Sequence, residues 1–163
     1  TLHTNDAMGV VPRLIDMGVE KYLIPPTLNV AAAQRLLRRL CQDCKIKVKA
    51  NVAEEGIINK ALSAMPEKYQ MEFASADGYY FYKPNIENPC KKCAGKAFKG
   101  RIGIFEALVL TDAISKLILE HASSSSIEAS AVASGMITMK QDGYLKVLEG
   151  VTTLEEVLRV AQD

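Results

Sequence analysis

Two closely spaced pairs of cysteines constrain the fold of this chain more than any other feature. Cys41 and Cys44 form one C-x-x-C pair, Cys90 and Cys93 form the other, and the sequence has no further cysteine. Each pair can present two thiolates to one metal ion, and together they supply the four ligands of a tetrahedral zinc site. We therefore expect residues 41–100 to form a subdomain held together by zinc, because this segment has no long apolar pattern to give it a core of its own.

The four cysteines have alternatives to zinc, namely two disulfides, free thiols in a core, or an iron–sulfur cluster. Disulfides are typical of secreted proteins, and polar Asn5 and Asp6 come too early for the apolar part of a secretory signal. In a chain without such a signal, paired C-x-x-C motifs more often bind metal. Four cysteine ligands also leave no open coordination position, so we expect a structural zinc and not a catalytic one.

Basic residues gather around the cysteines although the net charge of the chain is only +1. Residues 38–49 and 91–101 hold ten of the 20 basic residues and one of the 19 acidic residues. A zinc ion with four thiolates carries a formal charge of −2, which neighbouring lysines would offset. The alternative is a basic surface that faces anionic lipid headgroups or an acidic partner, and the sequence leaves both interpretations open.

The beginning of the chain carries signals for two helices. Asn5 or Asp6 would cap the first helix, Pro12 would kink it or delay its start, and Gly18 would end it. A pair of prolines would open a second helix over Leu28–Leu40, whose basic end suits the negative end of a helix dipole.

The rest of the chain mixes short strands with further helices. Asn51 and Glu54 have the spacing of a capping box, and residues 79–82 and 100–110 have strand character. We therefore expect a mostly α-helical chain with a few short strands and a zinc-held insert. The later helices are expected from Thr111 or Asp112 to His121, over Ile127–Ser134 and Thr138–Glu149, and after a capping box of Thr153 and Glu156.

His3 is the other residue that could carry chemistry. A lone histidine is usually a surface or structural residue, and His121 at a helix end is expected to be one. Around His3, however, Thr1, Thr4 and Asn5 add hydrogen-bonding groups at a strand-to-helix turn, where they could meet a phosphate.

Several segments together resemble one family, the hexameric ATPases that drive type II secretion and type IV pilus assembly. The segment TLHTNDA resembles the histidine box of that family, and the paired cysteines are typical of its assembly-type motors. The retraction motors of the family lack these cysteines. The resemblance spans the chain except residues 51–78, and its other segments are RLIDMGVE at 13–20, AQRLLRRLC at 33–41, KGRIGIFEALVL at 99–110 and the closing stretch 135–160.

The resemblance implies that this chain is the C-terminal part of a longer α/β protein with a RecA-like P-loop NTPase fold. Residues 1–40 would be the edge of the ATPase domain, residues 41–100 the tetracysteine zinc subdomain, and residues 101–163 a C-terminal helical region. His3 would contact the γ-phosphate of ATP. The zinc ligands would be Cys41, Cys44, Cys90 and Cys93.

The resemblance also implies the setting of the parent protein. It would be a cytoplasmic homohexamer on the inner face of the bacterial inner membrane, using ATP and Mg²⁺ to act on an integral-membrane platform protein within an assembly complex. The sequence has no G-x-x-x-x-G-K-[ST] loop, so we expect this chain alone not to hydrolyse ATP.

Two other classes of function compete with the motor. One is a zinc-dependent interaction module for nucleic acid or protein, and the other is a purely structural scaffold. The basic residues near the cysteines favour the module. Against nucleic acid, which we do not expect as a partner, the chain is nearly neutral and shows no pattern of basic residues with aromatic stacking residues.

Overall fold

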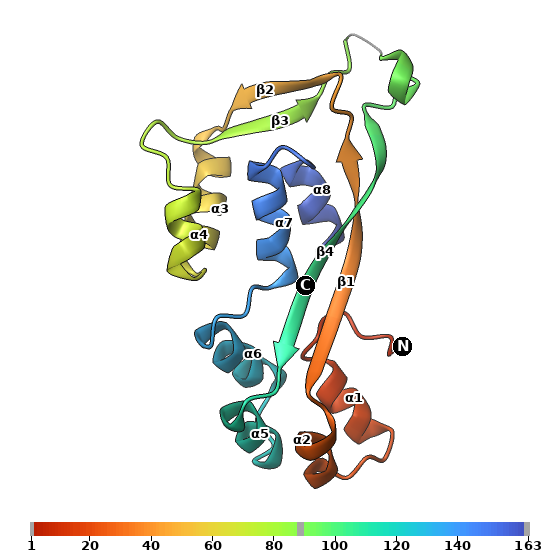
Figure 1. Ribbon diagram of the computed structural model, residues 1–163, viewed down its shortest axis with the longest axis vertical. Helices are drawn as coiled ribbons and strands as arrows, with labels where there is room; N and C mark the ends of the chain where they lie inside the picture. The colour runs from red at the N-terminus through yellow and green to blue at the C-terminus, as the bar shows by residue number, and fades with distance from the viewer. Residues whose placement is uncertain (1, 88–89, 162–163) are drawn as a thin grey trace. The chain divides into compact units, whose positions relative to one another are not determined.

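The computed structural model describes residues 2–87 and 90–161 (Figure 1). These residues form two compact units, each of which joins stretches that lie far apart in the sequence. This grouping differs from the three consecutive segments 1–40, 41–100 and 101–163. The division of the chain into those three domains stays a prediction. Among the described residues, no helix is both long and apolar enough to cross a membrane. The first unit comprises residues 2–34 and 105–139, and the second comprises residues 35–87, 90–104 and 140–161.

The first unit is built mainly from short helices around one apolar core. Ile24, Leu108 and Ile118 are at most 2 % exposed in this core. Thr111 and Ser123 cap two helices that the sequence predicted, which confirms both. Because short helices are marginal in water, the shared core is what keeps them folded. The elements are α1 (Val10–Asp16), η1 (Lys21–Leu23), α2 (Ile24–Thr27), α5 (Asp112–Leu119) and α6 (Ser124–Ala133).

The first predicted helix is confirmed as α1, and it starts late as Pro12 suggested. It begins at Val10, so Pro12 lies in the first turn, where its missing N–H costs no hydrogen bond. The Asp6 carboxylate accepts the N–H of Gly9 at 2.7 Å, so it caps the turn before the helix and not the helix itself. Gly18 follows the helix end with a φ of 87°, the left-handed conformation that a helix stop requires.

The predicted helix over Leu28–Leu40 is wrong, because Val30–Leu40 forms strand β1. The prolines lie instead in the single turn of α2, which ends at Thr27. From Ala31 to Leu37, buried or half-buried side chains alternate with exposed ones, which is the period of a strand. The alanine, leucine and arginine residues of this segment favour helices locally, so the pairing of β1 with β4 overrides their propensity.

The strand expected within residues 100–110 is confirmed as β4 (Phe98–Val109). It forms a two-stranded sheet with β1. Ile104, Glu106 and Leu108 alternate along it with exposed neighbours and are all buried. A carboxylate therefore shares the buried face of β4 with two aliphatic side chains.

The second unit combines a strand pair with helices, as Figure 1 shows. The predicted short strand at 79–82 is confirmed as β3, which pairs antiparallel with β2 so that Val48 lies opposite Phe81. The predicted capping box is also confirmed, because Asn51 and Glu54 each accept the other's backbone N–H. The elements are β2 (Lys45–Lys49), α3 (Val52–Ser63), α4 (Glu67–Glu72), β3 (Tyr80–Pro84), η2 (Lys91–Cys93), α8 (Leu154–Val160) and α7 (Met139–Leu148), whose first residue belongs to the first unit.

The turn after α7 packs directly against the strand pair. Gly150 has a φ of 70°, and a Cβ added there would lie 2.4 Å from a ring carbon of Tyr82. The Lys45 ammonium donates to the carbonyl oxygen of Gly150 at 2.8 Å and lies 4.1 Å from the centre of the Tyr82 ring. Burial of this ammonium lowers the pKa of Lys45. Only glycine fits this corner, for reasons of both conformation and space.

Gly150→Ala is expected to lower the free energy of unfolding of the second unit by about 2 kcal/mol, the sum of left-handed strain and a clash with a rigid ring. Chemical denaturation followed by circular dichroism measures the change. Gly100→Ala is the matched control, because Gly100 also has a positive φ, of 79°, but has nothing within 4 Å of its added Cβ. Equal losses for the two variants would contradict the packing role of Gly150.

Candidate functional site

The four cysteines gather in one cluster, although Cys44 and Cys90 lie far apart in the sequence. All four Sγ atoms lie within 4.8 Å of one another. Cys41 and Cys93 are buried, and the other two are half-buried. The Sγ atom of Cys41 lies 4.0 Å from that of Cys90, and the Sγ atom of Cys44 lies 3.8 Å from that of Cys93. The structure thus brings together all four residues that the sequence singled out.

The distances between the sulfur atoms fit a single tetrahedral ion. Zinc–sulfur bonds of about 2.3 Å place the ligand atoms of a tetrahedron about 3.8 Å apart, whereas a disulfide needs about 2 Å. The observed 3.8 and 4.0 Å match the tetrahedron. A set of four thiolates suits zinc, and it also suits an iron–sulfur cluster. The residues present therefore fit the metal that the sequence predicts.

Two backbone turns hold the thiols in place. In the first, the N–H of Cys44 donates to the carbonyl oxygen of Cys41 at 3.4 Å. In the second, the N–H of Gly95 donates to the carbonyl oxygen of Cys90 at 3.1 Å, and Gly95 has a φ of 75°. The N–H of Cys41 also donates to the carbonyl oxygen of Ala97 at 2.9 Å, which ties the two turns together.

The thiols differ in how readily they lose a proton. Burial, together with the neighbouring thiols, raises the pKa of Cys44 to about 12. Burial also opposes the charged form of Cys93, but hydrogen bonds from the Ala97 backbone and from the other thiols lower its pKa to about 7. Thiols this close cannot all ionise unless a cation compensates, and a divalent metal supplies that charge.

One lysine of the basic stretches lies close to the sulfur atoms. Lys92 donates to Asp43 at 2.5 Å, and the same carboxylate lies 3.9 Å from the Sγ atom of Cys41. The ion pair lowers the pKa of Asp43 and raises that of Lys92, to which the nearby Cys90 and Cys41 add a weaker effect. Lys92 is therefore placed to offset thiolate charge, although its side chain is exposed, as are those of Lys91, Lys96, Lys99 and Arg101.

Two other lysines of the basic stretches cover tyrosine rings, a pattern that is not visible in the sequence. Lys45 lies over Tyr82, and the ammonium of Lys47 lies 4.6 Å from the centre of the Tyr80 ring. The register of β2 and β3 creates these contacts between residues that are distant in the sequence. In each contact the lysine ammonium covers one face of the tyrosine ring, so a nucleobase cannot stack on that face.

His3 lies in the loop that precedes α1, and its side chain is exposed. The same loop is anchored four residues later at Ala7, which is fully buried and whose N–H donates to Glu106 at 2.6 Å. Within the loop, the Thr4 hydroxyl donates to the carbonyl oxygen of Asp6 at 2.9 Å. The sequence motifs pointed to His3 but not to Glu106, although a charged residue at a position that alternates with exposed ones in a predicted strand is a signal for it.

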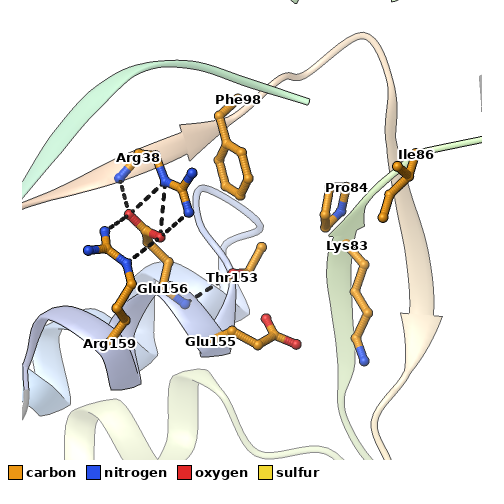
Figure 2. A pocket seen from close by; sticks show the side chains of 9 residues that line it. All are labelled: Arg38, Lys83, Pro84, Ile86, Phe98, Thr153, Glu155, Glu156 and Arg159. Atoms are coloured by element: carbon orange, nitrogen blue, oxygen red, sulfur yellow. Dashed lines mark hydrogen bonds and ion pairs between the residues drawn. The ribbon is translucent and has the colours of Figure 1, made fainter. Parts of the chain in front are cut away.

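A second buried carboxylate, Glu156, lies beside a pocket of about 350 Å³ in the second unit (Figure 2). The predicted capping box is half formed, because Thr153 accepts the N–H of Glu156 at 3.2 Å. The Glu156 carboxylate turns instead to Arg38 at 2.7 Å and Arg159 at 2.6 Å. The Arg38 guanidinium also lies 4.3 Å from the centre of the Phe98 ring. This group of charges joins α8 to β1 within the unit.

Comparison with known proteins adds evidence that the geometry cannot supply. Residues 1–159 match a family described as type II/IV secretion system protein. The chain is 40 % identical over 158 residues to the type IV pilus assembly ATPase PilB of Thermus thermophilus, covering 97 % of this chain and 16 % of that protein. For PilB of Myxococcus xanthus the identity is 36 %, covering 97 % of this chain and 26 % of the relative. For the type II secretion system protein E of Pseudomonas aeruginosa it is 37 %, covering 100 % and 29 %. The chain therefore spans less than a third of the length of these relatives.

Proposed function

This chain belongs to the type II/IV secretion system protein family, as its motifs predicted, and we propose that it is the C-terminal part of a hexameric ATPase motor. The observation that carries the proposal is an identity of 36–40 % to two type IV pilus assembly ATPases over 97 % of the chain. In the proposed motor, hydrolysis of Mg²⁺-bound ATP moves an integral-membrane platform protein. Pilin or pseudopilin subunits are thereby added to a filament. The motor works in the cytoplasm, on the inner face of the bacterial inner membrane.

Within this motor we propose a structural role for the cysteine cluster. Cys41, Cys44, Cys90 and Cys93 hold one zinc ion, which supplies the cation that closely packed thiolates need. The distances between the sulfur atoms support this assignment. The zinc fixes the turns at the ends of a long insert, so that β2, β3 and α3 can fold between them.

We propose that His3 contacts the γ-phosphate of ATP. Its position in the segment TLHTNDA and its exposed side chain support this role. A contact to the γ-phosphate distinguishes the triphosphate from the diphosphate, so it contributes to turnover more than to nucleotide binding. The phosphate-binding loop of the motor is expected in the part of the protein that lies outside this sequence.

His3→Ala in the full-length protein is expected to lower kcat for ATP about 10- to 100-fold, because it removes one group that stabilises transferring phosphate. The affinity for ADP should stay within about twofold of wild type. Steady-state ATPase assays and ADP titrations measure both quantities. His121→Ala is the control, since His121 is an exposed histidine that contacts Lys21 and should leave kcat unchanged. Full activity of His3→Ala would remove His3 from the site.

A further inference from the structure

Glu106 is a buried carboxylate to which the proposed function gives no role. It is 5 % exposed and lies on β4 between Ile104 and Leu108, both of which are fully buried. An aliphatic side chain would suit this position, because a carboxylate removed from water is costly unless hydrogen bonds compensate. Hydrogen bonds from other groups must therefore compensate for the burial of the Glu106 carboxylate.

Both oxygen atoms of Glu106 accept backbone hydrogen bonds. One accepts the N–H of Ala7 at 2.6 Å, and the other accepts the N–H of Met139 at 3.0 Å. Met139 is the first residue of α7, where an N–H has no partner inside the helix and the dipole favours a negative group. Ala7 lies in the loop that carries His3. One side chain thus fixes both a helix start and this loop.

We infer that Glu106 is a positioning residue for His3, an inference that rests on the proposed role of His3 at the γ-phosphate. Four residues separate His3 from the anchored Ala7, and two hydrogen bonds to Asp6 stiffen the intervening turn, from the Thr4 hydroxyl at 2.9 Å and from the Gly9 N–H at 2.7 Å. Because Ala7 is held in place, the part of the loop that carries His3 can move less. A displacement of about 1 Å in such a contact can cost a factor of about 100 in rate.

Glu106→Gln in the full-length protein tests this inference. The amide keeps one acceptor oxygen, but its NH₂ group faces a backbone donor, so one of the two hydrogen bonds is lost and the other, no longer made to a charged acceptor, is weakened. We expect kcat for ATP to fall about tenfold in the wild-type background and less than twofold in the His3→Ala background, because the positioning of a missing group has no value. Hydrogen exchange at the amide of Ala7 should be faster in Glu106→Gln, whether or not His3 is present.

The outcomes separate the inference from the proposed function. An equal loss of kcat in both backgrounds would show a general structural role and overturn the inference alone. Wild-type kcat or unchanged exchange at Ala7 in Glu106→Gln would also overturn it. Absence of ATP turnover in the wild-type protein, or full turnover in His3→Ala, would overturn the proposed function and the inference together.

Discussion

Removal of the zinc ion proposed for the cysteine cluster is expected to unfold the second unit while leaving α5 and α6 of the first unit folded. Structural zinc supplies about 10–16 kcal/mol of apparent free energy in small zinc domains, which exceeds the stability of most domains. Apart from zinc, the ends of the insert between Cys44 and Cys90 are joined mainly by the short pairing of β2 with β3, so loss of the ion should weaken them strongly. Hydrogen exchange measured segment by segment, before and after chelation, shows which elements lose protection.

Two controls make this expectation specific. Cys44→Ser should reproduce the effect of the chelator, because serine is a poor zinc ligand. Added zinc should restore the protection of the chelated wild type but not that of Cys44→Ser. Protein purified reduced and without chelator should contain one zinc per chain by elemental analysis. Zinc-free protein with full protection of β2, β3 and α3 would contradict the structural role.

Glu156→Ala is expected to lower the free energy of unfolding of the second unit by roughly 3 kcal/mol at neutral pH. Burial alone would raise the pKa of this carboxyl, but hydrogen bonds from Arg38 and Arg159 outweigh burial and lower the pKa to about 2. Each unit of pKa difference from the ordinary value of 4.5 corresponds to about 1.4 kcal/mol. The carboxylate is only 2 % exposed, so solvent screens it little, although both guanidinium groups are more than half exposed.

The lowered pKa of Glu156 determines how the stability of the second unit changes with pH. The folded-state pKa lies below the unfolded-state value, so the contribution of Glu156 is complete above about pH 4.5 and is lost as the pH falls through about 2. Denaturation of wild type and Glu156→Gln between pH 6 and 2 measures it. Glu155→Gln is the matched control, because the exposed neighbouring carboxylate should contribute less than about 0.5 kcal/mol. Parallel curves for wild type and Glu156→Gln would contradict the assigned pKa.

Local signals predicted most of the helices and singled out the four cysteines that the structure brings together. The cysteine pairs can be recognised from their spacing alone. The caps at Asn51 and Thr111 can be recognised from a polar side chain placed three residues before the N–H that it accepts. Each cap depends on neighbours in the sequence, and each cysteine pair is recognised by its own local spacing, so no knowledge of the tertiary structure is required to find them.

Features created by distant contacts could not be predicted in the same way. β1 has helix-forming residues, and its strand conformation depends on β4, which lies far away in the sequence. The carboxylate of Glu156 has the spacing of a capping box, yet Arg38 binds it more favourably than the local backbone does. The role of Glu106 likewise appears only once Ala7 and Met139 are brought to it.

The central claim is that this chain is one part of an ATP-driven motor whose phosphate-binding machinery lies elsewhere in the protein. ATP turnover measured side by side for the 163-residue chain and the full-length protein, both loaded with zinc, tests it most directly. Phosphoryl transfer needs a backbone cradle, a lysine, a magnesium site and a positioned water, and one histidine cannot replace them. We predict turnover by the full-length protein and none above a matched blank for the chain alone. Turnover by the isolated chain, or its absence from the full-length protein, would contradict the account.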